Sequence, residues 1–294
     1  MSNICSLNSS GKHCLPSDVI KNIYISIIPK EERSKNTNNH IAVIAEKTKC
    51  DSMNCDKEKE LCIVNKLKKN KSDKEIADMA KLASITYFKP TTKEFDHNYW
   101  LNNTEIDNIQ HQLYNQFEGY YYSNIHMIDL VMIDPKHKQF IEYDVHPLTE
   151  LNFVNELKES TKLNHNGKLK YYGVVINTDI SSNSGLHWFS IFIDFTVEPY
   201  TIEYFNSSGY DIKNQNFKKF FINLADEISF NCSPCKFVKV TDIQHQSSET
   251  ANCGSYALYY IWERLNGKPF SYFANNKIDD EKARSFREFL FRLK

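Results

Sequence analysis

One short segment, Asn252-Cys253-Gly254-Ser255-Tyr256, places a cysteine at the expected start of a helix. Unpaired backbone N–H groups and the helix dipole at such a position favour the thiolate, which is the nucleophilic form of cysteine. Gly254 allows a backbone or a substrate to approach the thiol closely. Structural cysteines are common at helix starts, however, so Cys253 alone indicates a core residue more readily than a nucleophile.

A nucleophilic thiol needs a partner that accepts and returns its proton, and His187 is the candidate for that task. This histidine lies in the apolar segment Leu186–Ile191, where an unpartnered imidazole would be costly. By itself, the position favours a core histidine whose ring bonds to backbone groups. The neighbours of His187 across the predicted sheet decide between the two interpretations.

The segments 186–195 and 200–205 are rich in β-branched and aromatic residues and predict two strands, joined by a hairpin turn at 196–199. When the residues that flank the turn are paired, His187 and Asn206 become diagonal neighbours on one face of the hairpin. Diagonal neighbours lie within reach of long side chains. We therefore expect the imidazole of His187 to meet the amide of Asn206.

The same register places two acidic residues, Asp194 and Glu203, on the opposite face of the hairpin. Neither carboxylate is then expected to reach His187. Asn206 is the better candidate to orient the imidazole, as in other sites with a Cys-His-Asn arrangement.

A developing oxyanion needs a hydrogen-bond donor besides the backbone N–H of Cys253. Gln246, in the loop that leads to Cys253, carries a neutral amide that can donate. Gln244 is the rival donor, and Glu249 cannot donate when it is ionised. A loop glutamine is more often simply solvated, so Gln246 gains weight only from its partners.

The rest of the chain predicts an α+β domain of about 200 residues behind a helical N-terminal segment. Pro90 interrupts the helical pattern, so we place the boundary between a Lys-rich helical arm, residues 1–92, and a second domain, residues 93–294. In the arm, Ser72 is the expected cap of a helix that ends near residue 84. The expected elements of the second domain, besides the hairpin, are a helix at 104–117 capped by Thr104, strands at 171–177 and 236–242, and helices at 216–230, at 253–265 and from 279 to the end.

Composition excludes several classes of protein. The 294 residues carry 36 Lys and Arg against 37 Asp and Glu, a formal net charge of -1, which argues against a nucleic-acid partner held by bulk positive charge. The most apolar stretches, Met127–Ile133 and Tyr256–Trp262, are far shorter than the roughly 20 apolar residues that a membrane span requires. We expect a protein of a reducing compartment, because eight cysteines in this length do not form a disulfide scaffold.

The cysteines outside the Cys253 segment carry no clear metal motif. Cys50, Cys55 and Cys62 lie close together in the arm, and Cys232 and Cys235 form a C-x-x-C. The two groups together could ligate zinc, but the paired spacing of structural zinc sites is absent. We therefore expect partly buried free thiols, and we expect no metal and no cofactor.

Four segments together carry a family resemblance: Gly185–Trp188, Ile202–Gly209, His245-Gln246 and Cys253-Gly254. They resemble the ubiquitin-like-protein protease superfamily, and most closely the polyprotein-processing cysteine proteases of African swine fever virus and related large cytoplasmic DNA viruses. The resemblance is clearest over residues 171–210 and 237–294. The segment Trp100–Thr104 is similar to the opening of the superfamily's catalytic domain, and Cys50–Cys55 to a stretch of the viral enzymes' arm.

The resemblance implies a papain-like, SUMO-protease-like core, with a central mixed sheet flanked by helices, behind a helical arm. It implies a role for each matching residue: Cys253 as the nucleophile, His187 as the general base and acid, Asn206 as its orienting partner and Gln246 as the oxyanion donor. Trp188 is then either one wall of a groove that admits only glycine beside the nucleophile, or an ordinary core aromatic.

By the same resemblance, the expected function is a cysteine endopeptidase that hydrolyses peptide bonds after Gly-Gly in viral structural polyproteins during virion maturation. Its expected location is the virion and the host cytoplasm, at viral assembly sites. The arm could position substrate, bind capsid or core-shell proteins, or support the catalytic domain. Two alternatives stay open: a deconjugase that removes a ubiquitin-like protein with the same four residues, and a non-catalytic virion or scaffold protein of this fold.

Overall fold

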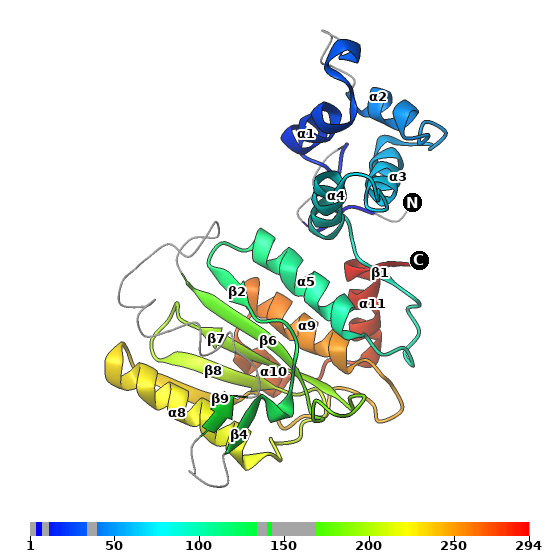
Figure 1. Ribbon diagram of the computed structural model, residues 1–294. Coiled ribbons are helices and arrows are strands. Elements are labelled where there is room, and N and C mark those ends of the chain that lie inside the picture. Colours follow the sequence, from blue (N-terminus) through cyan, green and yellow to red (C-terminus); the bar gives the residue numbers. More distant parts are fainter. Residues whose placement is uncertain (1–3, 8–11, 34–39, 134–139, 143–168, 294) are drawn as a thin grey trace. The chain divides into compact units, whose positions relative to one another are not determined.

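The computed structural model describes residues 4–7, 12–33, 40–133, 140–142 and 169–293 (Figure 1). The chain divides into two compact units, of which the first comprises Met1–Thr91 with Leu290–Arg292 and the second comprises Thr92–Phe289. The division lies beside the boundary expected after residue 92. The sequence did not predict that Leu290–Arg292 group with the first unit.

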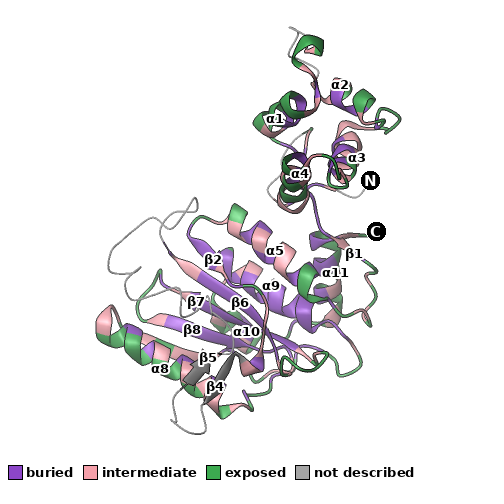
Figure 2. Ribbon diagram, viewed as in Figure 1, coloured by how far each residue is buried: buried purple, intermediate pink, exposed green. Residues whose placement is uncertain are grey.

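The first unit is helical, as predicted for the arm, and Figure 2 shows that its helices bury one side and expose the other. Apolar residues from every α-helix form its core, among them Ile23, Ile44, Val64 and Ala80. Its helices are α1 (Ser17–Ile27), η1 (Lys30–Glu32), α2 (His40–Lys47), α3 (Asp56–Leu67) and α4 (Lys74–Tyr87).

Both predicted helix caps are wrong by one or two residues. Asp73, and not Ser72, caps α4, and its carboxylate accepts a backbone N–H of the first turn. Asn102, and not Thr104, caps the helix α5 (Asn103–Gln116), where it forms a reciprocal capping box with Glu105. At α4, the carboxylate of Asp73 is also stabilised by the helix dipole. At α5, the capping box formed by Asn102 satisfies two backbone donors at once.

The first unit contains two disulfides, Cys5–Cys14 and Cys50–Cys62. The prediction of free thiols is therefore wrong for Cys50 and Cys62. Cys50 follows α2 and Cys62 lies in α3, and the packing of these helices brings their Cα atoms to 5.8 Å, within the range that a disulfide requires. The cysteines outside disulfides are Cys55, Cys232, Cys235 and Cys253.

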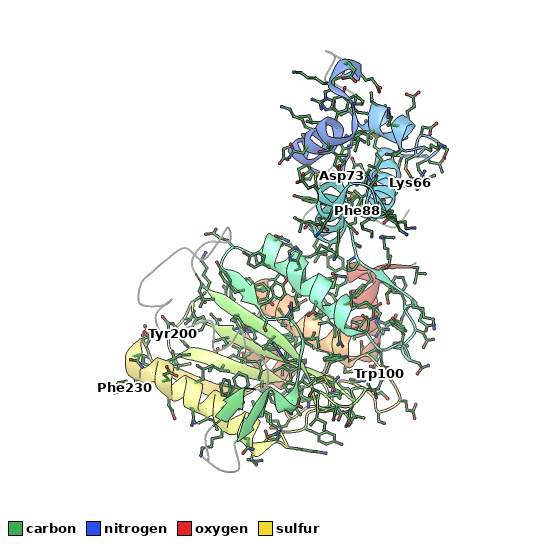
Figure 3. The ribbon with its side chains drawn as sticks, in the orientation of Figure 1. Lys66, Asp73, Phe88, Trp100, Tyr200 and Phe230 are labelled. Atoms are coloured by element: carbon green, nitrogen blue, oxygen red, sulfur yellow. A yellow bond between two sulfur atoms is a disulfide. The ribbon has the colours of Figure 1, made fainter. Side chains whose placement is uncertain are left out.

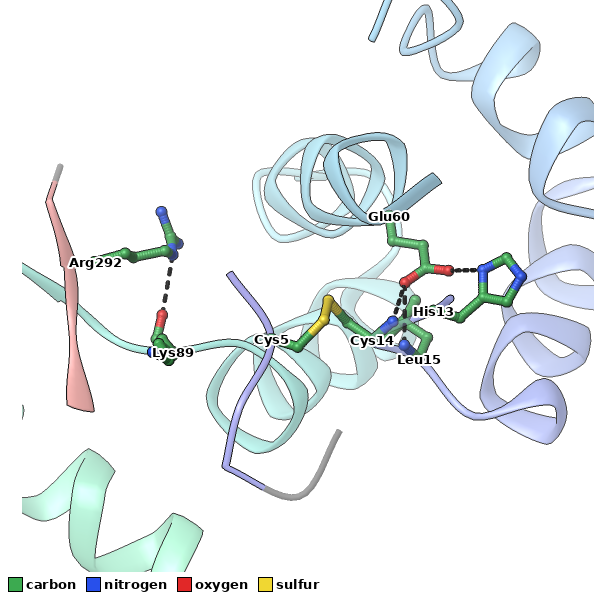
Figure 4. The surroundings of a disulfide bond; sticks show 7 residues. All are labelled: Cys5, His13, Cys14, Leu15, Glu60, Lys89 and Arg292. Atoms are coloured by element: carbon green, nitrogen blue, oxygen red, sulfur yellow. Dashed lines mark hydrogen bonds and ion pairs between the residues drawn. A yellow bond between two sulfur atoms is a disulfide. The ribbon is translucent and has the colours of Figure 1, made fainter. Parts of the chain in front are cut away.

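A buried carboxylate supports the chain around the first disulfide (Figure 4). Glu60 of α3 is fully buried and accepts the backbone N–H groups of Cys14 at 2.7 Å and Leu15 at 3.1 Å. Its other oxygen lies 2.7 Å from Nδ1 of His13. These bonds satisfy a group that would otherwise be costly to bury, and they fix the segment before α1 against α3.

The second unit is built on a mixed sheet, so the predicted α+β class and central sheet are confirmed. The order is β2-β6-β7-β8-β9, and β3 lies beside β6. The strands β6, β7 and β8 are antiparallel, whereas β2 and β3 run parallel to β6 and β9 runs parallel to β8. The bounds are β2 (Tyr120–Tyr122), β3 (His126–Met127), β6 (Tyr171–Asn177), β7 (Trp188–Asp194), β8 (Tyr200–Phe205) and β9 (Cys235–Lys239).

The remaining elements are short strands and flanking helices. The strands β4 (Val131–Ile133) and β5 (Phe140–Glu142) pair with each other in antiparallel fashion. The other bounds are β1 (Thr91–Thr92), β10 (Arg292–Leu293), η3 (Ile128–Leu130), α8 (Gln215–Asn231), α9 (Cys253–Leu265), α10 (Phe270–Asn275) and α11 (Asp280–Leu290).

The hairpin of β7 and β8 has the predicted register, with Ser190 opposite Phe205 and Asp194 opposite Thr201. Alternation along these strands gives the sheet two different faces, and Figure 1 shows α8 along one and α9 along the other. Phe189 packs against Phe217 of α8, with ring centroids 5.6 Å apart. Phe205 stacks on Tyr260 of α9 at 4.4 Å. The strands β7 and β8 are therefore covered by α8 on one face and by α9 on the other.

Candidate active site

Cys253 is the first residue of α9 and only 2% of it is exposed. Burial raises the pKa of its thiol, whereas backbone hydrogen bonds with Trp188 and Gly254 and the charge of Arg287 lower it. The thiol thus lies against the backbone of Trp188, the residue that follows His187 in the chain. The fold has brought the predicted nucleophile and the predicted base to the same end of the sheet.

The structure also brings His187 and Asn206 together, as the register predicts. The ring atom Nε2 of His187 lies 2.7 Å from Oδ1 of Asn206. The same oxygen accepts the backbone N–H of Ser208 at 3.0 Å, and the amide nitrogen of Asn206 donates to the hydroxyl of Tyr204 at 2.8 Å. A backbone N–H can only donate, so the atom facing His187 is the amide oxygen, which can only accept. Nε2 therefore carries the hydrogen, and Nδ1 is the basic nitrogen.

Burial shifts the pKa values of the two candidate proton-transfer groups in opposite directions. Burial lowers the pKa of His187, and the bond to Asn206 raises it only in part. The pKa of the Cys253 thiol is shifted the other way, upward, by burial. Burial thus favours the uncharged form of both groups, and proton transfer from the thiol to the imidazole separates charge.

Gln246 is the more buried of the two candidate glutamines. It is buried, and its carbonyl oxygen accepts the hydroxyl of Ser207 at 2.9 Å. Its Nε2 donates to the carbonyl oxygen of Thr250 at 2.6 Å, a bond that uses one of the two amide hydrogens. Gln244 is exposed, and its own Nε2 donates to the backbone oxygen of Gln246. The two bonds to the Gln246 side chain hold its amide in one orientation.

Trp188 is buried beside the nucleophile. Only 4% of it is exposed, and its indole N–H donates to the carbonyl oxygen of Leu101 at 3.1 Å. A Cβ atom at Gly254 would lie 3.3 Å from the indole and 3.2 Å from Leu101, so the glycine permits this packing. The indole is a packed core aromatic, and its role as a wall of the substrate groove stays a prediction. Trp100 is much more exposed, at 46% (Figure 3).

Sequence reasoning missed a polar cluster that fixes the residue before Cys253. The amide nitrogen of Asn252 lies 2.8 Å from Nδ1 of His97 and 3.0 Å from a carboxylate oxygen of Asp280. Its amide oxygen accepts from the guanidinium of Arg287 at 3.1 Å. The available signal was Arg287 itself, a charged residue among the apolar positions of the last helix.

Arg287 brings a positive charge close to the start of α9. It is fully buried, and it donates to the hydroxyl of Ser255 at 3.0 Å and to the backbone oxygen of Asp96 at 2.7 Å. These partners, like the amide of Asn252, are uncharged groups that leave the charge of the guanidinium in place. That charge favours the thiolate of Cys253.

Replacing Arg287 by glutamine is expected to raise the pKa of the Cys253 thiol, because the buried charge that favours the thiolate is removed. The measurement is the pH dependence of Cys253 alkylation by iodoacetamide, followed by mass spectrometry of the peptide that contains it. Arg287→Lys keeps the charge and is expected to keep the midpoint. Arg284→Gln, on the exposed side of the same helix, is the control. An unchanged midpoint in a folded Arg287→Gln protein contradicts the prediction.

Within the described ranges, no three His, Cys, Asp or Glu side chains are grouped so that they could hold a metal ion. No helix in that same part of the chain has the length and apolar character needed to cross a membrane.

Comparison with known proteins finds similar proteases of African swine fever virus. No family model matches the chain. The chain is 30% identical over 193 residues to the SUMO-1 cysteine protease of African swine fever virus (isolate Pig/Kenya/KEN-50/1950), and the match covers 66% of this chain and 68% of the relative. Identity and coverage are the same for the cysteine protease of the virus strain Badajoz 1971 Vero-adapted. A crystal structure of the African swine fever virus protease matches with a TM-score of 0.66 and 23% identity, covering 100% of this chain and 97% of the other.

The fold, the buried thiol at a helix start and these relatives together define a cysteine protease. More narrowly, the chain belongs to the family of the African swine fever virus cysteine protease. The resemblance seen in the sequence is thereby confirmed. The alternative of a non-catalytic virion or scaffold protein is set aside, because the relatives are cysteine proteases.

Proposed function

We propose that the chain is an endopeptidase that hydrolyses peptide bonds after Gly-Gly in viral structural polyproteins during virion maturation. The observation that carries the proposal is the juxtaposition of the Cys253 thiol with the backbone beside His187, whose ring is held by Asn206 at 2.7 Å. We propose the virion and the host cytoplasm, at viral assembly sites, as its place of action.

In the proposed reaction, Nδ1 of His187 takes the proton of the Cys253 thiol as sulfur attacks the carbonyl carbon. The backbone N–H of Cys253 and the amide of Gln246 donate to the oxyanion. His187 then returns its proton to the leaving amine as the C–N bond breaks, which leaves an acyl-enzyme. It next takes a proton from water, whose oxygen attacks the acyl carbon. The C–S bond then breaks, the carboxylic acid product leaves, and His187 returns its proton to the sulfur. Asn206 keeps the ring orientation through both steps.

We propose that the close packing next to the nucleophile contributes to a preference for glycine. The indole of Trp188 and the side chain of Leu101 approach Gly254 so closely that an added Cβ would be crowded. We propose that the acyl part of the substrate lies along this packed surface. A residue with a side chain would meet it, whereas glycine would not.

Replacing Gln246 by alanine is expected to lower kcat by about 10²–10³-fold, as loss of one oxyanion donor does in other hydrolases. KM is expected to change little, because the bond strengthens only when charge develops. Gln244→Ala is the matched control, and a loss confined to that variant would make Gln244 the donor.

The deciding experiment compares cleavage of peptides that contain Gly-Gly-Xaa with cleavage of peptides in which either glycine is alanine. Selective hydrolysis after Gly-Gly supports the proposal, and equal hydrolysis of all of them contradicts it. A second candidate is the removal of a ubiquitin-like protein, which is favoured by the similarity to a relative known as a SUMO-1 cysteine protease. Cleavage of a SUMO conjugate by a protein that ignores the peptides would establish that candidate.

We also propose that the first unit binds capsid or core-shell proteins, because it is a compact body with its own core and two disulfides. The test is chemical cross-linking of intact virions followed by mass spectrometry. Cross-links from exposed lysines of α3 and α4 to structural proteins are expected. Cross-links to those proteins from the second unit alone would contradict this role.

A further inference from the structure

A cavity of about 420 Å³ opens next to His187. His187 and Asn206 line it, together with the aromatic side chains of Phe189 and Tyr204. Large apolar side chains stand exposed at its mouth: 62% of Leu186 and 65% of Tyr210 are accessible. The Cys-His-Asn mechanism does not use the side chains of Leu186, Phe189 and Tyr210.

The cavity and the nucleophile lie on different faces of the sheet. Phe189 and Tyr204 belong to the face that α8 covers. Trp188, the neighbour of Cys253, belongs to the face that α9 covers, since it contacts Gly254 of that helix. His187 lies at the end of β7 and lines the cavity. An extended peptide bound at the site therefore crosses the end of the sheet from one face to the other.

The chemistry decides which part of the peptide reaches the cavity. The carbonyl carbon is attacked by sulfur, and its oxygen is held on the side of Gln246 and α9. The leaving nitrogen must receive its proton from His187, so it lies on the His187 side. The residues that follow the scissile bond continue from that nitrogen, past the imidazole and toward the cavity.

We propose that this cavity is the binding site for a bulky apolar side chain, aromatic or branched aliphatic, from the first two residues after the scissile bond. The inference rests on the proposed peptide hydrolysis. It adds a preference for particular substrate residues after the scissile bond. Apolar selection follows from the lining, because the nearby carboxylate of Asp211 is already paired with Lys218 at 2.7 Å. The one cation of the lining, Lys213, is exposed to solvent, so a charged substrate side chain would lose water here without gaining a buried partner.

The test uses four peptides with the same Gly-Gly acyl part and leaving parts that begin Phe-Ala, Ala-Phe, Ala-Ala or Asp-Ala. We expect kcat/KM for the better phenylalanine peptide to exceed that of the Ala-Ala peptide by roughly 10-fold or more. Leu186→Ala and Tyr210→Ala, both at exposed positions, are expected to reduce this ratio to about threefold or less. Phe230→Ala, at the far end of α8 and 90% exposed, is the matched control and should keep the full ratio (Figure 3).

Equal rates for all four peptides would overturn the cavity proposal and leave Gly-Gly hydrolysis standing. If no peptide is cleaved, the proposed hydrolysis fails instead, and binding tests the cavity directly. In that case the Cys253→Ala protein is titrated with the free dipeptide amides Phe-Ala-NH₂ and Ala-Ala-NH₂, with the NMR signals of the His187 ring as the readout. Tighter binding of Phe-Ala-NH₂, lost in Tyr210→Ala, supports the cavity, and equal binding overturns it.

Discussion

Replacing Cys253 by alanine is expected to lower kcat/KM for a Gly-Gly-Xaa peptide by more than about 10⁴-fold, with the fold retained. The sulfur is the atom proposed to bond to the substrate, so the covalent route is lost altogether. Alanine is an excellent helix former and leaves only a small gap at this buried position. Activity and the urea-induced unfolding curve, measured on the same protein, check both parts of the expectation.

Two variants make the test specific. His187→Ala is expected to be nearly as inactive, because it removes the base that is proposed to take the proton of the thiol, whose pKa burial raises. Cys235→Ala is the control, since burial raises the pKa of that thiol to about 11 and it lies at the start of β9, away from the site. Activity of Cys253→Ala above about one hundredth of the wild-type value, or loss of activity in Cys235→Ala, contradicts the assignment.

The sequence could predict the His187–Asn206 pair because local rules determine the hairpin. The alternation of side chains fixes the faces, and the short turn before β8 fixes the register. Once the register is known, the meeting of His187 and Asn206 follows from geometry. The bonds of Asn206 to Ser208 and Tyr204, which orient its amide, depend on a loop conformation that residue types alone do not determine.

The polar cluster behind Cys253 could not be predicted in the same way. Arg287 and Asn252 are 35 residues apart in the chain and meet only because α11 packs against the start of α9. The disulfide of Cys50 and Cys62 has the same origin, since it depends on how two helices pack. Contacts of this kind are set by tertiary structure, and a pattern with a period of two or 3.6 residues carries no information about them.

A buried ion cluster joins the sheet to the helix that carries Cys253. Glu203 of β8 is fully buried, and Arg264 of α9 donates to its two oxygens at 2.8 and 2.9 Å. Arg264 also binds Asp194 at 2.8 Å, and the hydroxyl of Tyr260 donates to Glu203 at 2.5 Å. As predicted from the register, Asp194 and Glu203 lie on the face away from His187.

Replacing Glu203 by alanine is therefore expected to lower the free energy of unfolding by about 3–5 kcal/mol, because it leaves a buried guanidinium with only part of its compensation. Urea unfolding followed by tryptophan fluorescence reports on the second unit, which contains Glu203. All three tryptophans belong to that unit: Trp100, Trp188 and Trp262. Glu288→Ala is the control, because its pair with Arg284 is exposed and is expected to contribute less than about 1 kcal/mol.

The double variant Glu203→Leu with Arg264→Met separates the cost of an unpaired charge from the value of the ion pair. Removing both partners leaves no buried charge uncompensated, so we expect it to be more stable than Glu203→Ala alone. A double variant as unstable as the single one would mean that packing, and not charge, holds α9 against β8.

Cys253 begins α9 and Asn206 follows β8, so the contact between these elements also positions the two site residues. Loosening this contact by Glu203→Ala is therefore expected to lower kcat as the temperature rises, well before the second unit unfolds.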